Sequence, residues 1–126
     1  GQPLVHTSHL TDGVVTDSGE CVEGRVVTGP ALLFPRVGLI TPGKLCVLGA
    51  DRRVVLSDCV LAVTLESVAE AKALRRRILT EWPAFASAYR GTGAPYITLE
   101  RASAVLSMIT GARRFAPRES QIAQLA

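Results

Sequence analysis

Short apolar runs separated by turn residues fill the first half of the chain. The longest are rich in Val or Leu, are bounded by Pro, Gly or Asp, and lie at residues 31–34, 44–48, 54–56 and 59–65. Runs of this length predict strands, and the nearly continuous last run predicts a central one. Shorter apolar pairs, separated by Asp-Gly, Ser-Gly or Glu-Gly, lie at residues 4–5, 14–15 and 26–27. Glycine in these places favours tight turns, so the first half is expected to be β-rich.

The apolar period changes to that of a helix after Leu65. Ser67 and Glu70 have the spacing of a capping box, which predicts a helix that continues to Thr80. Its expected inner face consists of Val68, Ala71, Leu74, Ile78 and Trp82. Pro83 then predicts a short helix with Phe85, Ala86 and Tyr89 inside and Gly91 as its C-cap.

Thr98 is expected to cap a third helix, from Leu99 to about Ile109, with Gly111 after its end. The predicted buried stripe of this helix is Leu99, Ala102, Val105, Leu106 and Ile109. Together these patterns predict an α/β fold of the α+β kind. Its mixed or antiparallel sheet comes from the N-terminal half, and helices from the C-terminal half pack against it.

The length of 126 residues suits one domain over 1–126, which we expect to be a fragment of a larger protein. The tail from Arg113 carries further cations, and Pro117 predicts the start of a helix, so residues 113–126 are expected to begin a linker or spacer helix. No apolar run approaches the length of a membrane span, so no membrane association is expected.

The basic residues are dominated by arginine, since only Lys44 and Lys72 among the 14 are lysines. Guanidinium groups suit bidentate contacts to phosphate or guanine, although high genomic G+C content produces the same bias. The net charge of +3 favours an anionic partner only mildly. The placement of the cations therefore matters more than their number.

The three cysteines, Cys21, Cys46 and Cys59, show no C-x-x-C spacing. This argues against a disulfide framework or a zinc ribbon and fits a reducing cytoplasm. Cys46 and Cys59 lie in apolar runs and are expected to be buried.

Catalytic chemistry finds little support in the sequence. A nucleophile would need His6 or His9 as its base, there is no nucleophile-elbow pattern, and the two histidines lack acidic or cysteine partners for a metal. The chain is therefore expected not to be an enzyme and to hold no cofactor or metal of its own.

Two segments, Phe34–Lys44 and Tyr89–Leu99, place cations beside glycines and small hydroxyls. Such loops bring backbone N–H groups and positive charge close to an anionic surface. The candidate DNA contacts at strand ends, loop tips and the glycine turn are Arg36, Lys44, Arg52, Arg53, Arg90 and Thr92.

Structural explanations compete with each of these assignments. A surface arginine such as Arg36 can complete an internal hydrogen bond, and the run 91–93 can be a helix C-cap with a tight turn. The cations of the first helix, Lys72 and residues 75–77, fit a solvated face better than a DNA contact.

An ordered series of segments resembles the target-recognition domains of restriction-modification systems. The series runs through Gly24, residues 32–38, Gly43-Lys44, residues 56–58, Val60, Trp82, residues 89–97 and a helix over 99–106. The resemblance covers roughly Leu10 to Met108. This family includes type I specificity subunits and the C-terminal domains of N6-adenine DNA methyltransferases.

The resemblance implies a bacterial, non-catalytic module that binds double-stranded DNA. A separate methyltransferase domain or subunit would bind S-adenosylmethionine and methylate a flipped adenine. The Asn/Asp-Pro-Pro-Tyr/Phe motif and a glycine-rich S-adenosylmethionine loop are absent from this sequence. The alternative is a protein–protein interaction domain of a larger cytoplasmic assembly, in which the helical half docks onto a partner.

Overall fold

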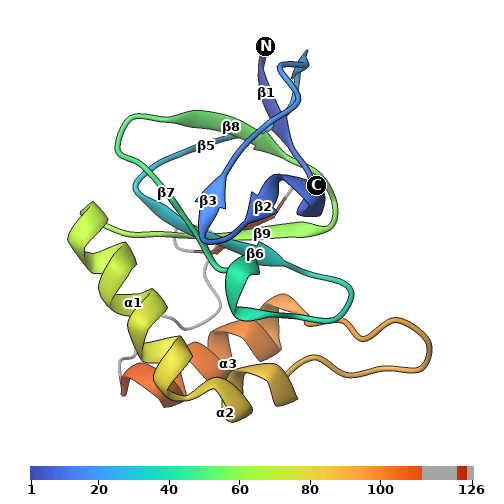
Figure 1. Cartoon of the computed structure of the whole chain (residues 1–126), viewed down its shortest axis with the longest axis vertical. Coiled ribbons are helices and arrows are strands. Elements are labelled where there is room, and N and C mark those ends of the chain that lie inside the picture. The colour runs from blue at the N-terminus through green and yellow to red at the C-terminus, as the bar shows by residue number, and fades with distance from the viewer. Residues whose placement is uncertain (112–121, 125–126) are drawn as a thin grey trace.

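Two mixed sheets lie one above the other, and helices cover the outer face of the larger sheet (Figure 1). The computed structural model describes residues 1–111 and the backbone of 122–124. The strands are β1 Gln2–Val5, β2 Leu10–Thr11, β3 Val14–Val15, β4 Cys21–Val22, β5 Val26–Thr28, β6 Ala31–Pro35, β7 Cys46–Leu48, β8 Arg53–Leu56, β9 Val60–Thr64 and β10 Ile122–Gln124. The helices are α1 Val68–Thr80, α2 Trp82–Ser87 and α3 Leu99–Thr110, and 3₁₀ turns lie at Thr7–His9 and Pro42–Lys44.

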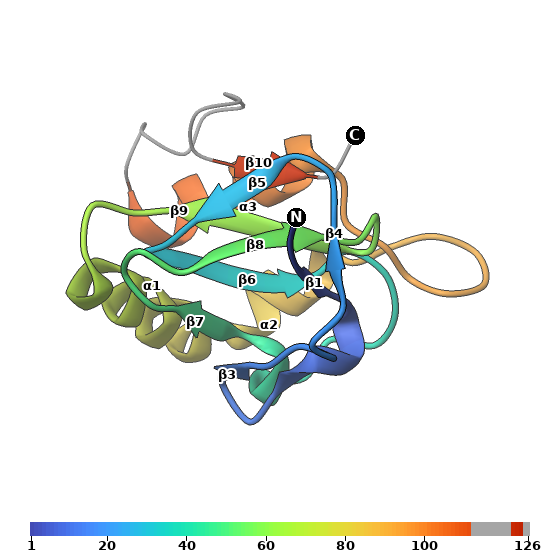
Figure 2. The same cartoon turned by 90° about the horizontal axis from the view of Figure 1, so that it is seen from above.

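The larger sheet has the strand order β10-β9-β6-β7-β3-β2, and the smaller has the order β4-β1-β8-β5. β6 pairs antiparallel with both β7 and β9, while β1 runs parallel to β8 and β3 runs parallel to β7. The view from above shows the smaller sheet overlying the larger one (Figure 2). The expected α+β fold with a β-rich N-terminal half is confirmed, with two sheets in place of one.

Alternation along β6 divides the interior into two cores. Ala31 and Leu33 face the smaller sheet and join a cluster that includes Val54. Leu32 and Phe34 face the helices and join a second cluster. All five residues of β6 are buried because both faces of this strand are covered. The result is a rigid central layer from whose end the loop after Pro35 emerges.

The helix-facing core is closed by residues of all three helices. Its members from the C-terminal half include Ala71, Leu74 and Ile78 of α1, Phe85 of α2, Ala88 and Tyr89 directly after α2, and Ala102, Val105, Leu106 and Ile109 of α3. The ring of Phe85 packs edge-on against Phe34, with centroids 5.5 Å apart. This core fixes the position of the α2–α3 connection relative to β6.

The helix caps follow the sequence pattern, with one exception. Ser67 accepts a hydrogen bond from the Glu70 amide, Thr98 accepts one from the Arg101 amide, and Gly111 ends α3 with φ +67°. α2, however, ends at Ser87 and not at Gly91. The predicted C-cap at Gly91 is wrong because the backbone of the preceding residue, Arg90, is already paired with Tyr96.

Several smaller predictions are also corrected. Leu99 is 37% exposed because it lies in the first turn of α3, while Ser103 is buried within the stripe. Cys59 is exposed, since it belongs to the turn between β8 and β9, whereas Cys46 is buried as expected. Lys44 lies in a 3₁₀ turn before β7, because the Lys44 amide donates back to Thr41 O.

The expected spacer helix from Pro117 falls on residues outside the described part, apart from 122–124. Those residues form β10, which pairs antiparallel with β9. At this position the chain is therefore a strand and not a helix.

Candidate nucleic-acid interface

The two glycine-containing segments singled out in the sequence lie against each other in the structure. The loop 36–41 follows β6, and the loop 88–98 connects α2 with α3; we call these the paired loops. The Ile97 amide donates to Arg36 O at 2.9 Å, and the Gly38 amide donates to Pro95 O at 2.8 Å. Val37 and Tyr96 thereby form an antiparallel bridge. The paired loops project together from one side of the molecule (Figure 1).

Tyr96 is paired on its other side as well. The Arg90 amide donates to Tyr96 O at 2.8 Å, and the Tyr96 amide donates back to Arg90 O at 3.0 Å. Residues directly opposite each other in an antiparallel pair project to the same face, with Cβ atoms about 5 Å apart. Arg90, Tyr96 and Val37 therefore form a row of neighbouring side chains: a cation, an aromatic ring and an aliphatic group.

A buried contact joins the bases of the paired loops. The Tyr89 phenol donates a hydrogen bond to Pro35 O, 54 residues away in the chain. Burial raises the pKa of Tyr89 well above its usual value, so the phenol keeps its proton and remains a donor. The two residues that make this contact, Pro35 and Tyr89, immediately precede Arg36 and Arg90 in the chain.

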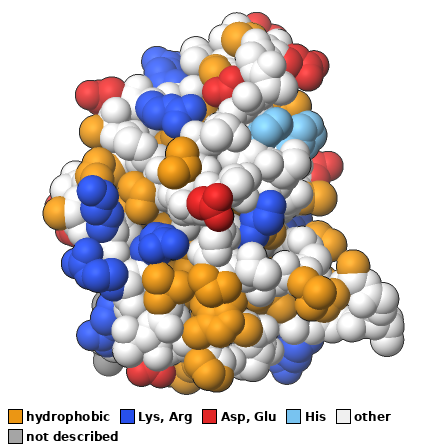
Figure 3. Space-filling model, in the orientation of Figure 1, with side chains coloured by type: hydrophobic (Ala, Val, Ile, Leu, Met, Phe, Trp, Pro, Cys, Tyr) orange, Lys and Arg blue, Asp and Glu red, His pale blue; other side chains and the backbone are white. Residues whose placement is uncertain are grey.

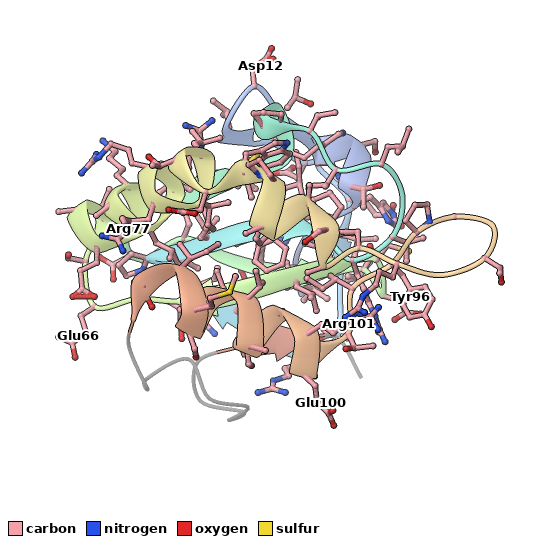
Figure 4. All side chains as sticks on the ribbon, turned by 90° about the horizontal axis from the view of Figure 1, so that it is seen from below. Asp12, Glu66, Arg77, Tyr96, Glu100 and Arg101 are labelled. Atoms are coloured by element: carbon pink, nitrogen blue, oxygen red, sulfur yellow. The ribbon has the colours of Figure 1, made fainter. Side chains whose placement is uncertain are left out.

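Arg101 holds the ring of Tyr96 in place. Its Nε donates to Ala88 O at 3.0 Å, its Nη2 donates to Tyr96 O at 2.7 Å, and its guanidinium carbon lies 5.1 Å from the centroid of the Tyr96 ring. Figure 4 shows Tyr96 and Arg101 side by side at the base of the projecting loop. The guanidinium therefore ties the first turn of α3 to Ala88 and Tyr96, near the two ends of the second paired loop.

The sequence analysis overlooked both Arg101 and Tyr96. One signal was present for Arg101, because a cation in the first turn of a helix opposes the helix dipole and indicates a specific partner elsewhere. Tyr96 lay inside a segment already singled out, but no local pattern marks an aromatic residue as the centre of two backbone pairings.

Three of the six predicted contacts lie on the paired loops. Arg36 is half-buried, while Arg90 and Thr92 are exposed. Within residues 1–111, no hydrogen bond or ion pair holds the side chains of Arg36 or Arg90. Their guanidinium groups thus remain available to an anion.

Lys44 lies near the same end of the sheet, but its ammonium already has an internal partner. Its Nζ donates to Thr7 O at 2.9 Å and ties the 3₁₀ turn Pro42–Lys44 to the N-terminal 3₁₀ turn. An ammonium retains further donors beyond this one bond, so Lys44 can still contribute charge to the surface.

Arg52 and Arg53 lie at the other end of the sheet. The Gly29 amide donates to Arg52 O at 2.8 Å, which places this pair beside the start of β6, whereas Arg36 follows its end. The two ends are about 20 Å apart along the strand. Arg52 also donates through Nη1 to Val15 O at 3.0 Å and pairs with Asp17 at 3.6 Å, while Arg53 is exposed. The six candidates therefore do not form a single cluster.

Two cations of α1 bond to neighbouring elements, and two others are exposed without such a bond among the described residues. Arg75 Nε donates to Leu45 O at 2.8 Å, and Arg77 Nη2 donates to Ile109 O at 2.6 Å, so both connect α1 to neighbouring elements. Lys72 and Arg76 are exposed beside a cavity of about 350 Å³. Figure 3 shows Lys and Arg side chains gathered over the α1 side of the molecule. The sequence favours a solvated face over a DNA contact for these cations, and the structure adds that Arg75 and Arg77 also bond to carbonyls of neighbouring elements.

A second surface, between α2 and α3, is mainly apolar. A groove of about 390 Å³ is lined by Ala84, Ser87, Ala88, Arg90, Arg101, Ala104, Val105 and Met108. Met108 is 64% exposed there. Arg90 borders both this groove and the paired loops.

The candidate catalytic groups are engaged elsewhere or isolated. His9 Nδ1 accepts a hydrogen bond from the His6 amide at 2.9 Å as part of the N-terminal turn. Burial raises the pKa of Cys46 to about 11, so its thiol stays protonated near neutral pH. Over 1–111 and 122–124, no three His, Cys, Asp or Glu side chains are grouped as a metal site requires.

Comparisons with protein-family models, with curated proteins and with solved structures find no match to this chain. Among the described residues, no helix combines the length and apolar character needed to cross a membrane.

Proposed function

We propose that the chain is a non-catalytic, sequence-specific recognition module for double-stranded DNA. The observation that carries the proposal is the pairing of loops 36–41 and 88–98, in which the backbone of Arg36 bonds to Ile97 and that of Arg90 bonds to Tyr96. Arg36, Arg90 and Thr92 therefore belong to one joined segment of the surface. The parent enzyme would be a bacterial, cytoplasmic restriction-modification enzyme that methylates adenine at N6. A separate methyltransferase domain or subunit would hold S-adenosylmethionine.

The backbone pairing and the chemistry of the paired loops suit a DNA groove. A pair of hydrogen-bonded strands fits the major groove, which is about 12 Å wide. The guanidinium groups can contact phosphates at the rim or guanine edges on the floor, and the Thr92 hydroxyl can contact either. Because backbone bonds hold both loops, little ordering entropy is lost on binding.

The proposal is tested by fluorescence anisotropy with a labelled 20-base-pair duplex at 50 and 200 mM salt. The full chain should bind less tightly at the higher salt, because each neutralised phosphate releases counterions. The double variant Arg36→Ala/Arg90→Ala should bind more weakly and lower the salt slope by about 2. The single variants Arg90→Ala and Arg53→Ala form the matched pair, since each removes one positive charge and Arg53 lies at the far end of the sheet.

Equal losses in Arg53→Ala and in the single variant Arg90→Ala would show that only net charge matters. Undetectable or salt-independent binding by the wild type would overturn the proposal that the chain binds DNA.

A protein-interaction domain is the second candidate, and the α2–α3 groove supports it. Its lining alanines and the exposed Met108 suit the side chain of a partner, and Arg90 and Arg101 in the same lining can pair with a carboxylate. A Met108→Glu variant separates the two functions, because it alters the groove and leaves the paired loops unchanged. Loss of assembly with the parent protein and unchanged DNA affinity would assign the groove to a partner.

A further inference from the structure

The paired loops expose apolar side chains at their centre as well as cations. Val37 is 39% exposed, Tyr96 is 42% exposed, and Leu39, at 85%, is the most exposed large hydrophobic residue of the described chain. A single exposed valine or leucine is ordinary on a protein surface. Here the three belong to one structural unit, because Val37 and Tyr96 are directly bridged and Leu39 follows Val37 by two residues.

Backbone bonds hold this apolar group in place. The Gly38 amide, between Val37 and Leu39, donates to Pro95 O at 2.8 Å. The guanidinium of Arg101 lies 5.1 Å from the centroid of the Tyr96 ring and restrains it. The surface is thus formed before any partner binds, which lowers the entropic cost of a contact.

Two cations adjoin the apolar group, one in the chain and one across the backbone pairing. Arg36 precedes Val37 in the chain, and Arg90 is paired directly with Tyr96. A surface that is apolar at its centre and cationic at its edge complements a ligand with an apolar feature between anionic groups. In the major groove of duplex DNA, the C5 methyl of thymine is that apolar feature, and the phosphates on both strands are the anions.

We infer that Leu39, supported by Val37 and Tyr96, reads thymine through its C5 methyl group in the major groove. This inference rests on the proposed function and adds to it the base that the module recognises. Arg36 and Arg90 contact the flanking phosphates and set the position of Leu39 over the base edge. The interaction is a methyl contact, so it requires no hydrogen-bonding partner on the base.

The test begins with selection of bound duplexes from a randomised library by the full chain. Each thymine of the selected duplex is then replaced by deoxyuridine, which removes only the C5 methyl. At one or more positions, binding should weaken about fourfold, the value expected for one buried methyl group. Leu39→Ala should bind the thymine duplex about fourfold less tightly and show no thymine–uracil difference. Leu39→Met should retain most of the discrimination, and Met108→Ala, which truncates an exposed apolar residue elsewhere, should retain all of it.

The outcomes separate this inference from the DNA assignment itself. Salt-dependent binding with equal affinity for thymine and uracil at every position would overturn the thymine contact and leave the DNA-binding proposal standing. A selection that enriches no sequence, together with undetectable binding, would overturn both. A thymine–uracil difference that persists in Leu39→Ala would assign the contact to another residue and overturn the role of Leu39.

Discussion

The phenol of Tyr89 donates a hydrogen bond to the carbonyl of Pro35, so one buried contact joins the residues that immediately precede Arg90 and Arg36. Tyr89 also packs against Phe85, with ring centroids 5.8 Å apart, and is therefore part of the helix-facing core. The positions of the two arginines thus depend on a core residue as well as on the pairing of the loops.

Tyr89→Phe should lower the free energy of unfolding by about 1 kcal/mol, because it removes this hydrogen bond and keeps the ring. Urea denaturation followed by circular dichroism measures the change. Tyr96→Phe is the matched control, since Tyr96 is 42% exposed, and it should shift stability by less than about 0.5 kcal/mol. Equal stabilities of wild type and Tyr89→Phe would show that the contact contributes nothing.

Gly91→Ala should destabilise the protein more than Gly93→Ala. Both glycines have positive φ, +131° and +78°, but a Cβ on Gly91 would lie 2.5 Å from Cε1 of Tyr96, whereas a Cβ on Gly93 meets nothing within 4 Å. The Gly93 variant should cost about 1 to 2 kcal/mol from backbone strain alone. The Gly91 variant adds the displacement of Tyr96 and should also weaken DNA binding. Thermal unfolding and anisotropy measure the two effects, and identical results for the pair would contradict the role of the close approach.

Arg101→Ala should lower stability by about 1.5 to 3 kcal/mol, because two charge-assisted hydrogen bonds to the carbonyls of Ala88 and Tyr96 are lost. Arg101→Lys should recover little, since one ammonium cannot reproduce the planar fork. Limited proteolysis should detect faster cleavage in the loop 88–98 of both variants. Arg90→Ala serves as the control and should leave stability within about 0.5 kcal/mol of wild type. Full rescue by lysine would show that charge, not geometry, maintains these contacts.

The three free thiols should react with a disulfide reagent in two classes at pH 8. Cys21 and Cys59 are exposed and should react rapidly. Cys46 is buried, its Sγ donates to Gly43 O at 3.5 Å, and it should react only after unfolding. Rapid reaction of all the thiols in the native protein would contradict the packing of β7.

Cys46 should also make stability decrease at alkaline pH. Burial raises its folded-state pKa from 9.0 to about 11, opposed by backbone hydrogen bonds and nearby cations. Between pH 9 and 11 the unfolded thiol loses its proton while the folded thiol keeps it, so the contribution is complete below pH 9 and is lost as the pH rises through 11. Denaturation of wild type and Cys46→Ala across this range should show a smaller pH dependence in the variant.

Local patterns predicted most of the secondary structure because the determinants were themselves local. The caps at Ser67 and Thr98 and the turn at Gly111 depend on a few neighbouring residues, and the structure contains all three. The end of α2 could not be read in the same way, because it is set by the pairing of Arg90 with Tyr96. A glycine after a short helix is equally compatible with a C-cap and with an extended turn.

The surface was harder to predict because it depends on long-range pairing. Two segments were recognised as loops with cations, but only the fold shows that Ile97 bonds to Arg36 and that Arg52 faces Asp17 instead of a partner. Arginines in α1 looked like a solvated face, yet Arg75 and Arg77 reach carbonyls on other elements. The exposure of Leu39 depends on neighbours that no linear pattern reveals.

The bonds between the paired loops come from backbone N–H and C=O groups, which every residue other than proline supplies. The side chains at positions 36, 37, 39 and 92 take no part in these bonds, so they can be exchanged with little effect on how the loops are joined. Diversifying these positions while preserving Tyr89, Gly91 and Arg101 would yield a set of proteins with one architecture and different loop surfaces.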